Sequence, residues 1–347
     1  MSSPIQKKHP FRIFFISGLV TLLSLAYVGG MMGPQALLIA CVLVLVEVIF
    51  SFENAIINAK VLSGVSEFWR KIFLTIGILI AVFGMRLIFP IVIVAVTTGL
   101  PFGEVVNLAT NEPARYSEAL NSAHISIAAF GGMFLTMLCL HFFFDRTRKV
   151  RWISIIEKPL QDMGRWWLYS VVSIVILAIL ALIPTNKEPV ETAVAGAVGI
   201  VTYIVVHGLA ELFARRQSKN GAVLKTGMAG FMAFLYLEVL DASFSFDSVI
   251  GAFAVTQNVL LIAIGLGVGA LWVRSLTIYM VDHHVLKAYR YLEHGAHYTI
   301  GVLALVLLAG IFYDIPEVIA GVFGLIIVGL SIGSSVAASR ADSAPAR

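Results

Sequence analysis

Long apolar runs separated by short polar segments dominate the pattern along this chain. A helix needs about 20 mostly apolar residues to cross the hydrocarbon core of a bilayer. Runs of that kind recur throughout the sequence, and the last two are short. The pattern predicts about ten membrane-spanning helices. They cover residues 11–29, 35–59, 71–98, 122–144, 166–184, 191–212, 226–256, 259–281, 298–313 and 315–334.

The positive charges lie in alternate loops of this predicted arrangement. Lysine and arginine gather in loops 60–71, 146–165, 215–225 and 287–290, whereas loops 99–121 and 313–317 carry mainly acids. Because lysine and arginine are enriched in cytoplasmic loops, the alternation predicts that both termini are cytoplasmic. Aromatic residues placed as in an interfacial belt support these helix ends. They are Trp152, Trp166, Trp167 and Tyr169.

Composition excludes a large soluble domain. The chain is 59% hydrophobic and 13% charged, with a mean hydropathy of +0.93, whereas soluble domains contain about 25% charged residues. The net charge of +4 reflects the loop asymmetry and gives no reason to expect a nucleic-acid partner. Cys41 and Cys139 lie far apart in apolar runs, so we interpret them as small core residues.

One acidic motif occurs twice. Glu47–Asn54 reads Glu-Val-Ile-Phe-Ser-Phe-Glu-Asn, and Asp241–Ser248, offset by 194 residues, reads Asp-Ala-Ser-Phe-Ser-Phe-Asp-Ser. The copies lie in the second and seventh predicted helices, which cross in opposite directions, and Arg86 and Arg274 correspond in the third and eighth. The predicted fold is therefore an all-α, polytopic membrane helix bundle of two inverted five-helix halves. The halves are residues 1–189 with motif helix 35–59 and residues 190–334 with motif helix 226–256, followed by a disordered tail at 335–347.

The motif acids share helix faces with other oxygen-bearing groups, because residues spaced by four and seven lie on one side of a helix. One such stripe is Glu47, Ser51, Asn54 and Asn58, and the other is Glu238, Asp241, Ser245 and Ser248. Glu53 and Asp247 lie off these stripes and would join them if the helices unwind at Phe-Ser-Phe. Buried carboxylates need positive partners, and the motif acids outnumber Arg86 and Arg274.

This excess of negative charge predicts a bound cation, and an all-oxygen set suits manganese, magnesium or calcium. The predicted metal ligands are Glu47, Glu53, Asn54, Glu238, Asp241, Asp247 and Ser248, with Arg86 and Arg274 balancing charge when the ion leaves. No permanently bound cofactor is expected. Two alternatives stay open, namely an ion-pair network that locks the halves together and a proton relay through the same carboxylates.

The histidines carry weaker signals. We interpret His207 as a hydrogen-bonded interior residue, and His141 as an interfacial cap, with a His141–Asp145 metal pair as the alternative. The crowded histidines of segment 283–297 predict a solvated face, with metal or pH sensing as the alternative. The sequence contains no phosphate-binding loop and no G-x-S-x-G or H-E-x-x-H motif, so we expect neither an enzyme nor a pump driven by ATP.

At its two motifs the chain resembles the TerC-type membrane proteins, named for tellurium resistance, and among them an uncharacterised bacterial branch. Glu47 to Asn54 matches the first motif of that family, with Glu53 where the family has aspartate. Glu238, Asp241, Phe244, Asp247 and Ser248 match the second motif completely. The resemblance implies a divalent-cation exporter, manganese foremost, or a membrane component of a tellurite-stress system. It also implies a bacterial inner membrane.

The functional hypothesis is efflux of a divalent cation through a carboxylate site at the bilayer midplane, coupled to proton entry. The rival hypothesis is a membrane component that does not transport and anchors soluble stress-response proteins through basic loops 145–165 and 213–226. An intramembrane enzyme using Ser245 or Ser248 with a histidine is disfavoured because no histidine lies near either serine in sequence.

Overall fold

The computed structural model describes residues 9–165, 167–218, 224–313, 315–316 and 318–343. Within these ranges, the side chains of Thr97, Ser245, Phe246, Asp247, Ile250, Ala254, Val318 and Ser343 lie outside the description. The helices are α1 (Pro10–Met32), α2 (Pro34–Phe50), α3 (Phe52–Ser63), α4 (Glu67–Leu79), the π-helix η1 (Ile80–Ile88), α5 (Phe89–Thr98), α6 (Phe102–Asn111), α7 (Pro113–Ser122), α8 (His124–Phe143), α9 (Ser154–Met163), α10 (Leu168–Leu182), α11 (Pro189–Ser218), α12 (Gly227–Val255), α13 (Val259–Asp282), α14 (Val285–Ala288), α15 (Leu292–Gly310) and α16 (Val318–Ser343).

The described residues contain eight helices that are long and apolar enough to cross a membrane, or up to ten if each of two bent pairs forms one span. The bent pairs are α2 with α3 and α9 with α10. Each predicted span has a helix or bent pair at its position, which confirms a polytopic helical bundle. Trp166, expected in the aromatic belt, lies outside the described residues.

The expected disordered tail requires a correction. Helix α16 continues to Ser343, so residues 335–343 are helical, while residues 344–347 lie outside the description. Two contacts hold this extension: the hydroxyl of Ser335 donates to the carbonyl of Ser331 and accepts the backbone N–H of Tyr291, and Arg290 pairs with Asp342 at 2.9 Å. The small polar residues that predicted a flexible terminus therefore belong to a helix that is hydrogen-bonded to the segment before α15.

The chain forms two compact units that alternate along the sequence. Unit 1 contains residues 1–124 and 209–283, and unit 2 contains residues 125–208 and 284–347. This division reflects spatial contacts and differs in kind from the sequence halves at 1–189 and 190–334. The inverted relation of those halves stays a prediction.

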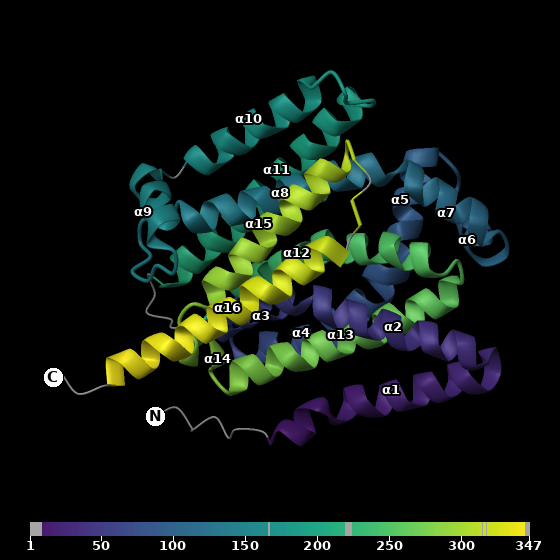
Figure 1. The fold of residues 1–347 in the computed structure, drawn as a ribbon, viewed down its shortest axis with the longest axis horizontal. Helices are drawn as coiled ribbons and strands as arrows, with labels where there is room; N and C mark the ends of the chain where they lie inside the picture. Colours follow the sequence, from purple (N-terminus) through teal and green to yellow (C-terminus); the bar gives the residue numbers. More distant parts are fainter. Residues whose placement is uncertain (1–8, 166, 219–223, 314, 317, 344–347) are drawn as a thin grey trace. The chain divides into compact units, whose positions relative to one another are not determined.

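In unit 1 each motif helix packs against the helix that follows the other motif. Helix α13 packs along α2 and α3 (Figure 1). Helix α12 packs against α4 and η1. Close approach is possible because glycine faces the partner helix, as at Gly265, which lies against the Leu43 side chain. This reciprocal packing brings both copies of the acidic motif into one unit.

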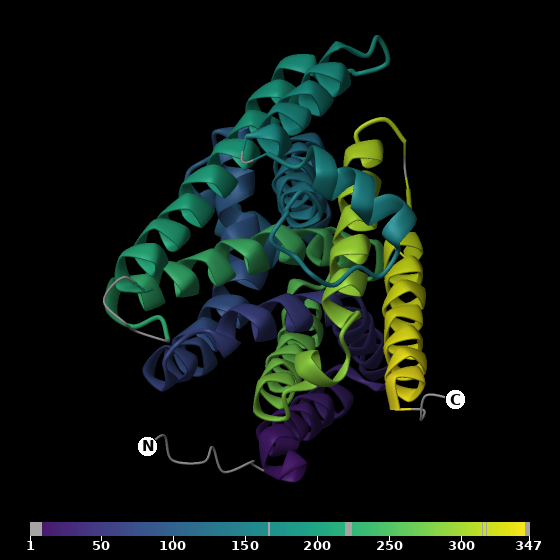
Figure 2. The ribbon, with the colours of Figure 1, turned by 90° about the vertical axis from the view of Figure 1, so that its left-hand side faces the viewer.

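In unit 2, α15 packs along α16 (Figure 2). Gly132 of α8 lies against Leu308 of α15, and Gly199 of α11 lies against the backbone of Phe130 in α8. Membrane helices approach closely at such small residues because dispersion contacts replace the hydrophobic effect in lipid. Unit 2 thus has its own packed interior.

Candidate functional site

The first motif lies at a break in its helix. Helix α2 ends at Phe50, α3 begins at Phe52, and their axes differ by 49°. Ser51 occupies the break, and its side-chain hydroxyl donates to Oε1 of Glu47 at 3.0 Å. The second motif lies in α12, which is continuous from Gly227 to Val255. The unwinding anticipated at Phe-Ser-Phe takes the form of a bend between α2 and α3 in the first copy. In the second copy, α12 continues through the motif as one helix.

Glu47 forms a buried ion pair with Arg86. Its carboxylate is fully buried, and its Oε1 accepts a hydrogen bond from Nη2 of Arg86. Arg86 lies in η1, and its Nη1 also donates to the carbonyl of Ala81 at 2.6 Å. Short π-helical segments inside α-helices often mark functional positions. The second oxygen of Glu47, Oε2, has no hydrogen-bond partner among the described residues.

Two acids of the second motif share one arginine. Nη2 of Arg274 on α13 lies 3.5 Å from Oε1 of Glu238 and 3.5 Å from Oδ2 of Asp241. All three side chains are buried, so water cannot screen them. The guanidinium also lies 3.7 Å from the ring centre of Phe73, a cation–π contact. Two carboxylates facing one guanidinium leave an excess of negative charge when both are ionised.

Two glycines admit these side chains, and sequence analysis missed both. A Cβ at Gly77 would lie 2.8 Å from Oε1 of Glu238 and 3.1 Å from Nη1 of Arg274. A Cβ at Gly269 would lie 2.5 Å from both Cβ and Cγ of Glu47. Each glycine belongs to the helix that packs on a motif helix, so its role depends on a partner distant in sequence. Glycine is common in membrane helices, and no local signal singles these two out.

Further polar groups lie just beyond the bend. Asn54 and Asn58, four residues apart on α3, are both buried. Oδ1 of Asn54 and both side-chain polar atoms of Asn58 have no hydrogen-bond partner among the described residues. Glu53, in the first turn of α3, is also buried, and no described lysine or arginine lies within ion-pair distance of it. Such groups are costly in an apolar interior unless a ligand or water satisfies them.

The predicted ligands are thus divided into two sets. Glu47 and Glu53 belong to the first motif, and Glu238 and Asp241 to the second, and no hydrogen bond or ion pair between described side chains joins the two sets. In the described part of the chain, no three acidic, histidine or cysteine side chains are grouped closely enough to hold a metal ion. Ser248 is buried, and the side chain of Asp247 lies outside the described residues. The assignment of these residues to a metal stays a prediction.

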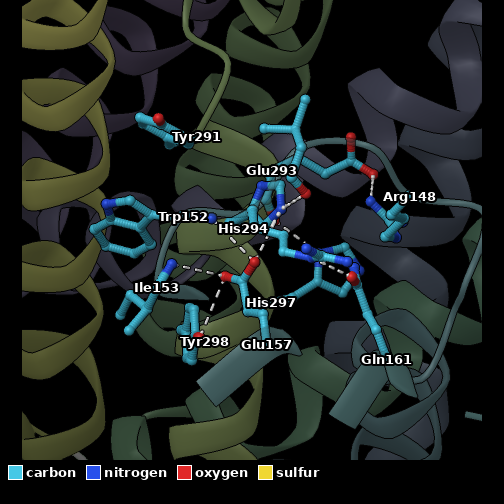
Figure 3. A network of polar contacts seen from close by, with 12 residues as sticks. Arg148, Trp152, Ile153, Glu157, Gln161, Tyr291, Glu293, His294, His297 and Tyr298 are labelled. Atoms are coloured by element: carbon cyan, nitrogen blue, oxygen red, sulfur yellow. Dashed lines mark hydrogen bonds and ion pairs between the residues drawn. The ribbon is translucent and has the colours of Figure 1, made fainter. Parts of the chain in front are cut away.

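The segment of crowded histidines corrects another expectation. His294 and His297 belong to α15 and are buried, so the predicted solvated face is wrong for them. Figure 3 shows them within a polar network around Glu157. Nε2 of His294 lies 3.0 Å from the carbonyl of Val150 and 3.6 Å from Oε2 of Glu157. The ring of His297 stacks on Phe142 with centres 3.6 Å apart, which explains its burial.

His141 and His207 lie in a cluster of aromatic rings in unit 2. Nδ1 of His141 is 2.7 Å from the hydroxyl of Tyr203, and the ring of His207 stacks on the same tyrosine. Oδ1 of Asp145 accepts hydrogen bonds from the backbone N–H and the hydroxyl of Thr147, and Oδ2 of Asp145 lies 3.7 Å from Nε of Arg148. This geometry gives no support to a His141–Asp145 metal pair.

These features define a multi-pass, all-helical membrane protein with buried acid–arginine centres. The chain belongs to the family described as "Protein of unknown function (DUF475)", whose pattern matches residues 52–342. It is also similar to "Uncharacterized membrane protein YceF" of Bacillus subtilis (strain 168), with 29% identity over 140 residues. The match covers 39% of this chain and 52% of that protein, so the chain spans about half the length of this relative. No solved structure matches the chain.

Proposed function

We propose that this protein transports a divalent cation, manganese foremost, across a bacterial inner membrane, with both termini in the cytoplasm. The observation that carries the proposal is the group of buried carboxylate oxygens without hydrogen-bond partners on α2 and α12, at Glu47, Glu238 and Asp241. The four described motif acids are buried, and two buried arginines, Arg86 and Arg274, pair with three of them and leave Glu53 without a described ion-pair partner. A cation is the ligand that this imbalance favours.

In this proposal the arginines act as tethered substitutes for the transported ion. Arg86 neutralises Glu47, and Arg274 balances one of the two negative charges that Glu238 and Asp241 carry when both are ionised. An entering cation would draw the carboxylates away from the guanidinium groups, and its departure would return them. The partnerless amide oxygens of Asn54 and Asn58 are further candidate ligands at the bend. Protonation of a carboxylate left without a partner would couple export to proton entry.

The resemblance to TerC-type proteins belongs to this proposal, with a role in tellurite stress as its alternative form. Glu53 replaces the aspartate of that family and adds a methylene group beside the bend. The longer side chain would shift the preferred ionic radius. The proposal includes no enzymatic step.

The test is metal flux in liposomes that contain the purified full chain. Glu47→Gln and Asp241→Asn each keep the side-chain size and remove a negative charge, so we expect manganese flux to fall at least about tenfold, as loss of a charged ligand does. Glu118→Gln, at an exposed acid of α7, is the matched control and should transport normally. In cells, wild type but not Asp247→Asn should relieve the manganese sensitivity of a deletion strain. Undiminished flux in both charge-removing variants would refute the proposal.

A further inference from the structure

Helix α9 buries two polar side chains toward the protein and exposes apolar side chains next to the charged residues Lys158 and Asp162. Glu157 and Gln161, one turn apart, are 1% and 4% exposed, whereas Ile155 is 85% exposed and Met163 is 55% exposed. Ile155, Pro159 and Met163 are spaced by four residues and form an apolar stripe on the outer side. A helix that faced water would show the opposite arrangement. The outer side of α9 therefore suits an apolar environment.

The polar side is fixed to unit 2 by specific hydrogen bonds (Figure 3). The carboxylate of Glu157 accepts the backbone N–H groups of Trp152 and Ile153 at 3.0 and 3.2 Å, and the hydroxyl of Tyr298 at 3.3 Å. Oε1 of Gln161 accepts Nε of Arg151 at 2.6 Å. These bonds hold the helix in one rotation about its axis, so the outward position of the apolar stripe is built into the fold.

The next helix gives the direction of the bilayer. Helix α10 contains no charged residue and exposes an apolar stripe at Val171, Val175, Ile179 and Leu182, as a lipid-facing span does. The axes of α9 and α10 differ by 103°. If α10 crosses the membrane, α9 lies nearly parallel to its surface. Trp167, 40% exposed between the two helices, is a residue type that favours this interface.

Positive side chains surround a hollow beside α9. The hollow has a volume of about 340 Å³ and is lined by Arg146, Arg151, Gln161 and Asp162. Arg146 donates to the backbone carbonyls of Gln161 and Asp162, and Arg151 uses Nε for Gln161, which leaves further guanidinium N–H groups for a ligand. Asp162 contributes the one negative charge of this lining. Exposed Lys149, Lys158 and Arg165 add positive charge nearby.

We propose that α9 is an interfacial helix and that this hollow binds the headgroup of an anionic phospholipid. The phosphate oxygens would accept paired hydrogen bonds from the guanidinium N–H groups of Arg146 and Arg151, because the planar guanidinium matches the geometry of a phosphate. The acyl chains would lie along the stripe of Ile155, Pro159 and Met163. Basic clusters beside membrane helices recognise anionic lipids through this combination of charge and apolar contact.

The exposed stripe of Ile155, Pro159 and Met163 favours lipid over a soluble protein as the occupant. The same loop, 145–165, is the anchor expected by the rival hypothesis of soluble partners. Its apolar stripe is continuous with an interfacial tryptophan and a lipid-facing span, so the bilayer covers it without any additional component. The inference is independent of cation transport and would hold if the chain transported nothing.

One experiment measures lipid retention. The purified full chain, first with phosphatidylglycerol and then with phosphatidylcholine, is analysed by native mass spectrometry. We expect preferential retention of phosphatidylglycerol, reduced at least about tenfold in Arg146→Gln/Arg151→Gln. Arg215→Gln/Arg216→Gln removes two positive charges from the end of α11 and should retain the lipid. Equal retention of both lipids, or displacement by millimolar inorganic phosphate, would overturn the assignment.

A second experiment needs no arginine variant, so it stays informative if that variant fails to fold. A spin label is placed at Ile155→Cys or at Lys158→Cys in a chain whose two native cysteines, Cys41 and Cys139, are replaced by alanine. In phosphatidylglycerol nanodiscs we expect the label at 155 to be more accessible to oxygen than to a water-soluble nickel chelate. The label at 158, on the polar edge, should show the reverse. A water-exposed label at 155 would overturn the interfacial placement.

Discussion

The side chain of Glu47 on α2 passes directly over Gly269 on α13, where a Cβ atom would lie 2.5 Å from both Cβ and Cγ of the glutamate. Helix α13 can therefore lie close to α2 only where this position lacks a side chain. The same contact holds Glu47 toward Arg86, so helix packing and the buried ion pair depend on each other.

Gly269→Ala should accordingly destabilise the protein. The added methyl group must displace either the glutamate or the helix, and overpacking of this kind costs about 1–3 kcal/mol. We expect a lower midpoint of thermal unfolding in detergent. Gly18→Ala is the control, because a Cβ at Gly18 meets nothing within 4 Å. Equal midpoints for the two variants would contradict the packing described here.

Removal of one partner of the Glu47–Arg86 pair should cost more than removal of both. Arg86→Gln leaves a buried carboxylate uncompensated, at a cost of about 3–5 kcal/mol, whereas Arg86→Gln combined with Glu47→Gln removes both charges. We expect the double variant to unfold at a higher temperature than Arg86→Gln alone. Arg115→Gln, which breaks an exposed pair with Glu112, should shift stability by less than about 1 kcal/mol. Additive effects of the two buried substitutions would argue against the pair.

Loss of Arg274 should destabilise the protein more than loss of the charge of Asp241, one of its two acidic partners. Asp241→Asn leaves Glu238 and Arg274 as a one-to-one pair, so we expect little loss of stability from it. Arg274→Gln leaves both carboxylates without a cation and should be the most destabilising change in this centre. Thermal unfolding of the two variants checks the order. A larger loss from Asp241→Asn would mean that the aspartate has a stabilising partner other than the arginine.

Glu157 should control the position of α9. Glu157→Ala removes the acceptor of the Trp152 and Ile153 N–H groups and of the Tyr298 hydroxyl. We expect faster amide hydrogen exchange across residues 152–163, measured by mass spectrometry. Asp162→Ala, at an exposed position on the same helix, should leave exchange nearly unchanged. Unaltered protection in Glu157→Ala would show that other contacts hold the helix.

Lys225 predicts a pH dependence of stability. It precedes α12, and burial lowers the pKa of its ammonium group below the ordinary 10.5, although Glu211 acts in the opposite direction. The unfolded chain thus binds this proton more tightly than the folded chain, so the stability contribution of Lys225 rises as the pH increases toward 10.5. Lys225→Met should be more stable than wild type at neutral pH, and the difference should shrink as alkali is added. A constant difference in unfolding midpoint would refute this sign.

Hydropathy alone placed the spans, because the bilayer requires each span to be a long apolar segment and the length of such a segment can be read locally in the sequence. Hydropathy placed neither the bend at Ser51 nor the π-helix around Arg86, although the motif had suggested unwinding at Phe-Ser-Phe. It also misplaced His294 and His297, because a short stretch rich in histidine looks solvated until Phe142 and Glu157 cover it. The prediction of a disordered tail beyond residue 334 was wrong for a similar reason, because Ser335 is bonded to Tyr291, which is distant in sequence.

The sequence by itself determined that this is a helical membrane protein with duplicated acids inside its spans, because each of those features can be read within one helix. Only the tertiary structure decided that Glu47 pairs with Arg86, that Glu238 and Asp241 share Arg274, and that Gly77 and Gly269 make room for them. A buried charge is stable only beside its partner, and which partner that is depends on how helices distant in sequence pack.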